Sequence, residues 1–407
     1  TINMDMHIYR RQRMQWKMGK LKDYFKIYRF NTDKITEITD NHKILLFVRS
    51  DLIGDYIASR HLYRILRQSE KYKNYKFVLI GNISWREIAL AFDCDCIDEF
   101  IWINRKDIEN KEYRKRFKHW LSKREYDCVI NPQYSRDFIS EEIVKIISAK
   151  EKICLHGDNY NLSEYQRARY DDNYTKVIKN NPQKQMYLYR TNEMLEYLTG
   201  EKQYTSRPKF ILKENHFNLI NFDWKTPYVI MFPFARTNER IYKIEYFLEL
   251  AKYIYEKYCI KTLICGSKED WHKLKKLDIH YVENICGLYP LADLPYIFNK
   301  AKLILTNDTM AVHIASGVNE NVICFSNGKF IVNKDIYTLC EENNEAYYFN
   351  EPYEGIKTVF PYSLYEDIIN NRFDYENNFF ESSYNINDIC IKNVMILIDN
   401  LLNKSLK

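Results

Sequence analysis

The stretch Ala301-Lys-Leu-Ile-Leu-Thr-Asn-Asp-Thr-Met-Ala-Val-His-Ile-Ala315 contains the pattern that decides the fold. Its apolar part, Leu303–Leu305, is predicted to be a buried strand, and Met310–Ser316 is predicted to be the helix that follows. The polar residues Asp308 and Thr309 then lie in the turn that joins the strand to the helix. Such a strand–turn–helix unit is typical of an α/β protein with a parallel sheet.

The same alternation occurs in two series along the chain. Predicted strands of the first series lie at 44–48, 77–80, 97–103, 128–130 and 152–155. Those of the second series lie at 228–232, 261–265, 303–305 and 322–325. Strands that alternate with helices of about ten residues imply right-handed crossovers and a parallel sheet covered on both faces. The expected fold class is therefore α/β, with two Rossmann-like domains facing a cleft.

Changes in composition and the positions of proline residues divide the chain into five expected segments. They are a basic amphipathic extension (1–42), an N-terminal Rossmann-like domain (43–207), a linker (208–227), a C-terminal Rossmann-like domain (228–385) and a C-terminal helix (386–407). Pro208 and Pro227 bound the linker, and the alternation begins again immediately after it.

The positive charge is confined to one end. Lys and Arg total 61 against 55 Asp and Glu, and eight basic and two acidic residues in the first thirty positions account for the whole net charge of +6. A neutral body disfavours nucleic-acid binding. In the extension, Trp16, Tyr24 and Phe25 alternate with the cations at helical spacing. This pattern fits a helix on an anionic membrane surface, or equally one packed on the body or on a sister subunit.

Several signals are missing from the sequence. No apolar run approaches the ~20 residues that span a bilayer, and the first residues lack the features of a secretory signal. Neither GxGxxG nor the P-loop pattern occurs. The ten cysteines show no CxxC and no metal-ligand spacing. We therefore expect a cytoplasmic protein without a metal or a bound cofactor.

Ligands of open α/β sheets bind beyond the carboxyl ends of the strands, where three polar segments lie. The first is Arg49–Asp55, after the first strand. In it Ser50 is polar, Gly54 permits a tight turn, and Asp55 lies at or beside the start of the next helix. Asp55 is either a helix cap or a carboxylate base directed into the cleft.

The second polar segment follows the first strand of the second series and is Pro-Phe-Ala-Arg-Thr-Asn-Glu-Arg at 233–240. Arg236, Thr237 and Arg240 lie between strand and helix. A guanidinium there can clamp a phosphate with paired N–H donors, or it can form a surface salt bridge with Glu239 or Glu245.

The third polar segment is the turn at Asp308 and Thr309. The start of the following helix has unpaired backbone N–H groups and a positive dipole, which suit a pyrophosphate. His313 lies about one and a half turns along the helix. Taken alone, a histidine in this place is more often structural than catalytic.

Together the three segments resemble the ADP-heptose:lipopolysaccharide heptosyltransferases, which form glycosyltransferase family 9 and have the GT-B fold. The resemblance covers roughly residues 43–330 and rests on Asp-Leu-Ile-Gly-Asp at 51–55, on Pro-x-Ala followed by Arg240 and Tyr242, and on the stretch 301–315. That stretch matches the family's Asp-Ser/Thr-Gly-x-x-His signature except that Met310 replaces Gly.

The resemblance implies a role for each matching position. Asp55 resembles the catalytic base, and Arg240 resembles the basic residue that holds the donor phosphates. Asp308 and Thr309 resemble the pair that contacts the donor sugar and the pyrophosphate. Tyr289 falls where the family lines its nucleotide base pocket.

The remaining candidates are less specific. Arg236, Thr237 and Met310 are counted with the donor site, and the Met310 side chain is expected to narrow or reshape it. Ser50, Gly54 and His313 are counted as structural or active-site residues. Asp93-Cys94-Asp95 has the form of a metal-binding DxD, but it precedes a strand and so lies at the wrong end of the sheet.

The implied function is an inverting, metal-independent sugar transfer from a nucleotide donor, ADP-heptose, to a saccharide such as lipopolysaccharide or lipooligosaccharide. The N-terminal domain would bind the acceptor and the C-terminal domain the nucleotide-sugar. The extension 1–42 suits a lipid-linked acceptor at the inner face of the cytoplasmic membrane. The alternatives are a different nucleotide-sugar donor, a protein acceptor, or a non-catalytic nucleotide- or glycan-binding module.

Overall fold

The computed structural model describes residues 30–275, 277–332, 337–338, 346–378 and 381–405. The helix predicted around Trp16 therefore lies outside the described residues. The chain forms two compact units. The first unit comprises residues up to Asp51 together with Asn74–Arg86 and Cys96–Ile178, and the second comprises Leu52–Lys73, Glu87–Asp95 and the residues from Lys179 onward.

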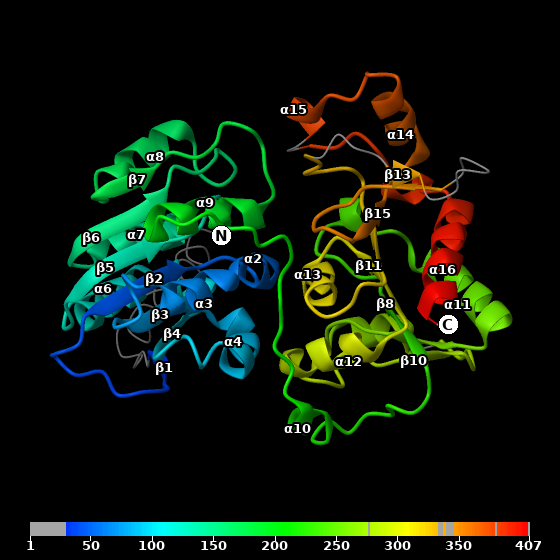
Figure 1. Ribbon diagram of the computed structural model, residues 1–407, viewed down its shortest axis with the longest axis horizontal. Coiled ribbons are helices and arrows are strands. Elements are labelled where there is room, and N and C mark those ends of the chain that lie inside the picture. The colour runs from blue at the N-terminus through cyan, green and yellow to red at the C-terminus, as the bar shows by residue number, and fades with distance from the viewer. Residues whose placement is uncertain (1–29, 276, 333–336, 339–345, 379–380, 406–407) are drawn as a thin grey trace, which may run out of the picture. The chain divides into compact units, whose positions relative to one another are not determined.

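The first unit contains a seven-stranded sheet in the order β1-β4-β3-β2-β5-β6-β7 (Figure 1). Its strands are β1 (Asn31–Lys34), β2 (Ile44–Arg49), β3 (Lys76–Asn82), β4 (Glu99–Ile103), β5 (Tyr126–Asn131), β6 (Ala149–Leu155) and β7 (Lys176–Ile178). All neighbouring strands are parallel except β1, which pairs antiparallel with β4. β2 to β5 form the interior of the sheet and are almost entirely buried, as parallel strands covered on both faces require.

The edge strand β1 was assigned by the sequence analysis to the basic extension. Asp33 accepts a hydrogen bond from the indole N–H of Trp102 at 2.5 Å and pairs with Arg86 at 2.8 Å. Phe30 packs its ring on Phe117, with ring centres 5.2 Å apart. The last part of the predicted extension is therefore an integral part of the first sheet, and the basic run ends just before it.

The helices of the first unit are α5 (Arg105–Ile108), α6 (Lys111–Leu121), α7 (Phe138–Ile146) and α8 (Glu164–Asp171). α6 buries Tyr113, Phe117 and Leu121, which are spaced by four residues and therefore share one face. They join a core with strand residues and with α7. The Asn110 side chain caps α6 by accepting hydrogen bonds from two backbone N–H groups of its first turn.

The second unit contains a six-stranded, all-parallel sheet in the order β10-β9-β8-β11-β12-β15 (Figure 1). Its strands are β8 (Tyr228–Phe232), β9 (Lys261–Ile264), β10 (Val282–Asn284), β11 (Leu303–Asn307), β12 (Val322–Phe325) and β15 (Lys357–Val359). A separate antiparallel pair is formed by β13 (Tyr337–Thr338) and β14 (Tyr347–Tyr348).

The helices of the second unit come from three parts of the chain. They are α2 (Ile53–Ser59), α3 (His61–Gln68), α4 (Arg86–Phe92), α9 (Tyr187–Thr199), α10 (Glu214–Phe217), α11 (Ile244–Tyr258), α12 (Leu294–Lys300), α13 (Met310–Ser316), α14 (Tyr362–Ile369), α15 (Tyr375–Asn378) and α16 (Ile391–Ser405). α9 ends at Gly200, whose φ of 77° is the left-handed conformation that glycine adopts most readily.

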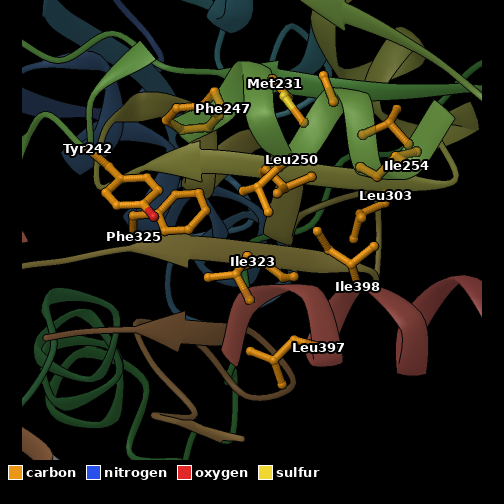
Figure 2. Close-up of a cluster of buried hydrophobic side chains, with 14 of the residues drawn as sticks. Met231, Tyr242, Phe247, Leu250, Ile254, Leu303, Ile323, Phe325, Leu397 and Ile398 are labelled. Atoms are coloured by element: carbon orange, nitrogen blue, oxygen red, sulfur yellow. The ribbon is translucent and has the colours of Figure 1, made fainter. Parts of the chain in front are cut away.

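The core of the second unit lies between its sheet and the helices α11 and α16 (Figure 2). Phe247, Leu250 and Ile254 of α11 and Leu397 and Ile398 of α16 are all fully buried there. Burying a side chain of this size contributes about 1.5–3 kcal/mol to folding, so this apolar cluster holds the sheet rigid. A rigid sheet in turn sets the positions of the loops at its edges.

The predicted α/β class with two Rossmann-like domains is confirmed, since each unit has its own parallel sheet. α2 ends and α3 begins at Arg60, which is the cap residue of both helices. The C-terminal helix begins at Ile391, after a 3₁₀ turn at Ile386–Asp388. The strands β7, β10 and β15 were missed because three residues are too few to show a period. Within the described residues, no helix has the length and apolar character needed to cross a membrane.

Candidate functional site

The polar loops of the second unit meet at the carboxyl edge of its sheet. β8, β11 and β12 are parallel neighbours, so the segments that follow them emerge together. Asn307, the last residue of β11, is fully buried and joins them. Its side-chain carbonyl accepts from the Tyr242 N–H at 3.1 Å, and its amide donates to the Pro233 carbonyl at 2.7 Å. Asn307 therefore fixes the loop after β8 against the end of β11.

Two cations lie near one aromatic ring at this edge. The Arg240 guanidinium lies 5.4 Å from the centre of the Phe330 ring and 3.9 Å from the Asp308 carboxylate. The Lys329 ammonium lies 5.4 Å from the same ring and 3.2 Å from Glu239. Arg240 thus pairs with Asp308 rather than with the neighbouring glutamate of its own loop. Two nearby cations are able to bind the negative charge of a diphosphate group.

The turn after β11 begins the helix α13. Thr309 is the N-cap residue, and its hydroxyl oxygen accepts from the Ala311 N–H at 3.2 Å. Because capping uses only an acceptor lone pair, the Thr309 O–H hydrogen remains able to donate to a ligand. Asp308 donates its backbone N–H to the Phe325 carbonyl at 3.2 Å, which fixes the turn against β12. Met310 is the first residue of the helix and is partly exposed beside this turn.

His313 and Tyr353 form a hydrogen-bonded pair next to the turn. The Tyr353 hydroxyl lies 2.5 Å from Nδ1 of His313, and Tyr353 is almost fully buried. Desolvation lowers the pKa of His313 from 6.5 to about 4, against the opposing pull of the Asp308 charge. Burial, followed by the charges of Asp55 and Asp308, raises the pKa of Tyr353 well above its usual value. Both groups are therefore neutral at pH 7.

Asp55 lies close to this pair. Its helix, α2, approaches α13 so closely that a methyl group on Gly54 would lie 2.8 Å from Cδ2 and 2.9 Å from Nε2 of His313. Only glycine permits this contact. Asp55 is exposed in the first turn of α2, and the N-cap position belongs to Leu52 instead. Asp55 thus follows directly on the residue that contacts His313, and the charges of Asp55 and Asp308 both raise the pKa of Tyr353.

These elements match a known family. The family model described as glycosyltransferase family 9 (heptosyltransferase) matches residues 114–325, just over half of the chain. The chain belongs to glycosyltransferase family 9. It is therefore a glycosyltransferase, as the sequence analysis predicted. No curated protein sequence is significantly similar to it.

Solved structures of this glycosyltransferase family share the fold. The ADP-heptose lipopolysaccharide heptosyltransferase II of E. coli has a TM-score of 0.63 and 16% identity, with 89% of this chain and 100% of that chain covered. A family 9 glycosyltransferase from Veillonella parvula gives 0.62 and 16%, with 90% and 100% covered. The E. coli heptosyltransferase WaaC with ADP gives 0.61 and 14%, with 88% and 99% covered. The likeness establishes the GT-B fold.

Other predicted site residues of the glycosyltransferase lie outside the group around Tyr353. Ser50, in the first unit, is fully buried and its hydroxyl donates to Asp137 at 2.8 Å. The Tyr289 hydroxyl donates to the Asn221 carbonyl at 3.2 Å, in the loop after the edge strand β10. Arg236 and Thr237 are exposed in the loop after β8, on the same segment as Arg240.

The DxD sequence has a structural explanation. Asp93 is buried, pairs with Arg60 at 2.8 Å and accepts from the Tyr56 hydroxyl at 2.6 Å. Asp95 pairs with Arg64 at 2.8 Å. Both carboxylates are thus engaged by guanidinium groups, which neutralise the charge that would attract a cation. In the described parts of the chain, no cluster of three or more His, Cys, Asp or Glu residues is arranged to hold a metal ion.

Sequence reasoning missed Lys329, Phe330 and Tyr353. Lys329 had a detectable signal, because Ser-Asn-Gly-Lys at 326–329 directly follows a buried apolar strand. Gly328 there has a φ of 86°, the conformation that favours glycine. Tyr353 had no detectable sequence signal, because it lies in an irregular segment 40 residues beyond its partner His313.

The low pKa of His313 predicts a specific loss of stability in acid. The unfolded chain takes up this proton near pH 6.5 and the native protein only near pH 4. Between these values the unfolded state binds more protons, so the free energy of unfolding falls as the pH falls. From pH 7 to 4.5 this single group accounts for about 2 kcal/mol of that loss.

Urea unfolding of the wild type and of His313→Gln at the two pH values measures the effect. The variant lacks the titrating ring, so its stability is expected to decline less over the same range. An equal decline in both proteins would show that His313 titrates normally in the native state.

Proposed function

We propose that the protein is an inverting, metal-independent glycosyltransferase that moves a heptose from ADP-heptose to a saccharide acceptor. The observation that carries the proposal is the close approach of Gly54 to His313, which places the neighbouring Asp55 beside the helix that begins after Asp308. His313 is hydrogen-bonded to Tyr353, and Arg240 is ion-paired to Asp308. This grouping combines a carboxylate able to act as a base with a cation able to hold a phosphate.

In the proposed reaction, the Asp55 carboxylate takes the proton of the acceptor hydroxyl. The hydroxyl oxygen forms a bond to the anomeric carbon of the donor, and the bond from that carbon to the diphosphate oxygen breaks. Attack from the face opposite the leaving group inverts the anomeric configuration. General-base help of this kind typically contributes about 10²–10⁴ in rate.

The leaving nucleoside diphosphate gains negative charge as the bond breaks. Arg240 and Lys329, which both lie 5.4 Å from the centre of the Phe330 ring, supply two positive charges for it. Their existing partners, Asp308 and Glu239, keep the two cations oriented in the absence of donor. We propose that these cations, together with the Thr309 hydroxyl, take the part that a metal ion has in other glycosyltransferases.

The donor and the acceptor are inferred from relatives. One solved family member, WaaC, is described with ADP and with an ADP-2-deoxy-2-fluoro heptose, and another is described as an ADP-heptose lipopolysaccharide heptosyltransferase. We propose ADP-heptose as the donor and a lipid-linked saccharide as the acceptor, without any role for nucleic acid. We further propose that residues 1–42 bring the enzyme to the inner face of the cytoplasmic membrane, as a peripheral contact of a cytoplasmic protein.

A different nucleotide-sugar is the second candidate donor. The Met310 side chain is partly exposed at the first turn of α13, beside Asp308 and Thr309. A side chain of this length beside the proposed sugar position favours a donor of another shape. Whether the acceptor is a saccharide or a protein is decided by the residues that bind the acceptor, and Met310 is counted with the donor site.

A transfer assay with ADP-heptose tests the proposal. Mass spectrometry is expected to detect addition of one heptose to a lipooligosaccharide acceptor, and NMR is expected to show an inverted anomeric centre. Activity should persist in EDTA. Transfer from another nucleotide-sugar alone would favour the second candidate, and loss of activity in EDTA would contradict the metal-independent mechanism.

A further inference from the structure

The basic residues of this chain concentrate in two segments. Residues 1–29 contain eight Lys and Arg against two acidic residues, and residues 111–124 contain seven against one. Each segment therefore has an excess of six positive charges, and the rest of the chain has a net charge of −6. The second segment is α6 with the turn that follows it, in the first unit.

α6 has one apolar and one cationic face. Tyr113 and Phe117 face the core of the first unit. On the opposite side Lys111, Lys115 and Lys118 are exposed at spacings of four and three residues, so they form a single row. Lys123, just beyond the end of the helix, is exposed as well.

The arginines of the segment are already engaged. Arg116 pairs with Glu112 at 2.9 Å, Arg124 pairs with Glu99 at 2.8 Å, and Arg114 donates to the Ile108 carbonyl at 2.7 Å. Among the described residues, no carboxylate lies within ion-pair distance of the four exposed lysines. The row of lysines is therefore the part of the segment that presents uncompensated charge to solvent.

An aromatic groove borders this row. Phe30 packs on Trp120 of α6 with ring centres 5.3 Å apart. The groove around them is also lined by Lys115, His119 and Lys123 and by the Glu112–Arg116 ion pair. Trp120 is partly exposed there. Phe30 directly follows Arg29, so the first basic segment joins the described structure at the groove.

We propose that α6 and the Phe30–Trp120 groove form a docking surface for the headgroups of an anionic phospholipid bilayer. A row of lysines beside partly exposed aromatic rings is the composition of interfacial helices, in which the cations attract anionic lipids and the aromatics rest at headgroup depth. The surface adds a folded, defined element to the membrane contact that was attributed to residues 1–42.

The end of the surface that contains Lys118 and Lys123 argues against a substrate site. α6 follows β4 and leads into β5, which are parallel to each other, so the helix runs from the carboxyl edge of the sheet back to its amino edge. Lys118 and Lys123 consequently lie toward the amino edge, away from the end where α/β proteins bind their substrates. The net charge of −6 on the rest of the chain disfavours a long nucleic acid.

Vesicle sedimentation of the full chain, without donor or acceptor, tests the surface separately from the transfer reaction. We expect binding to phosphatidylcholine vesicles that contain phosphatidylglycerol, and none to phosphatidylcholine alone. Because each lysine near an anionic surface contributes about fivefold to binding, K115E/K118E/K123E, which removes three lysines and adds three negative charges, is expected to bind at least 100-fold more weakly, as an order-of-magnitude estimate of about 5³. The matched control K202E/K225E/K392E reverses three exposed lysines of the second unit and is expected to bind like the wild type.

A chain lacking residues 1–29 retains α6 and is expected to keep part of the vesicle binding. Adding K115E/K118E/K123E to this shortened chain is expected to remove the remaining binding. Thermal melting checks that each variant is folded, and K115Q/K118Q/K123Q replaces the triple reversal if it is not. Unchanged vesicle binding of the α6 variants would overturn the proposal. Equal weakening of vesicle binding by the control substitutions would also overturn it. A preference for duplex RNA over vesicles, with the RNA binding lost in the α6 variants, would do so too.

Discussion

Replacing Asp55 with Asn is expected to reduce turnover by about 10²–10⁴ while leaving the protein folded. The amide keeps the size of the side chain but cannot take a proton from the acceptor hydroxyl. Asp55 is exposed and is not the N-cap of α2, so little stability depends on its charge. The kcat of heptose transfer is the decisive measurement, with KM for the donor expected to change little.

A matched substitution separates catalysis from general charge effects. Asp278 is an exposed aspartate on the same unit, and Asp278→Asn is expected to transfer at the wild-type rate. Near wild-type turnover of Asp55→Asn would reject its assignment as the base. If Asp55→Asn lost activity and also had a markedly lower melting temperature than the wild type, Asp55 would instead be assigned a structural role.

Replacing Arg240 with Ala is expected to weaken binding of the nucleotide product by about 10–100-fold. Hydrogen bonds to charged groups contribute about 1.5–3 kcal/mol each, and Arg240 would supply at least one to the diphosphate. Removal of Arg240 also leaves Asp308 without its cation, which adds repulsion toward the phosphates. Isothermal titration calorimetry with ADP measures the change directly.

The charge and the shape of Arg240 are separable. Arg240→Lys keeps the positive charge but not the planar pair of donors, so an intermediate affinity is expected. Arg372→Ala, which removes an exposed surface pair with Asp367, is the control and should bind ADP normally. Unchanged ADP affinity in Arg240→Ala would contradict its role at the diphosphate.

The local order of the second unit follows closely from its sequence. β8, α13 and β12 begin and end at the predicted residues, because each combines a clear period or apolar run with a boundary signal. The same reasoning failed for β1, whose four residues follow a basic run that suggested a surface helix. The pairing of β1 with β4 depends on Asp33 meeting Trp102 and Arg86, which are far away in sequence.

The candidate site also has residues that the sequence identified and contacts that it could not predict. Asp55, Arg240 and Asp308 were identifiable because each follows an apolar strand, and ligands of parallel sheets bind at that end. Lys329 satisfied the same rule and was overlooked. The pairing of Arg240 with Asp308, rather than with a glutamate near it in sequence, could not be predicted, since ion pairs depend on distances in space.

The sequence by itself determined the two-sheet α/β architecture and the polar segments that carry the chemistry, because strand and helix periods are local properties. Only the tertiary structure decided what lies beside those segments. Tyr353 reaches His313 from an irregular loop, and Gly54 matters because α13 lies against it. Such contacts join residues that no local pattern relates, and they exist only once the hydrophobic cores have fixed the elements in place.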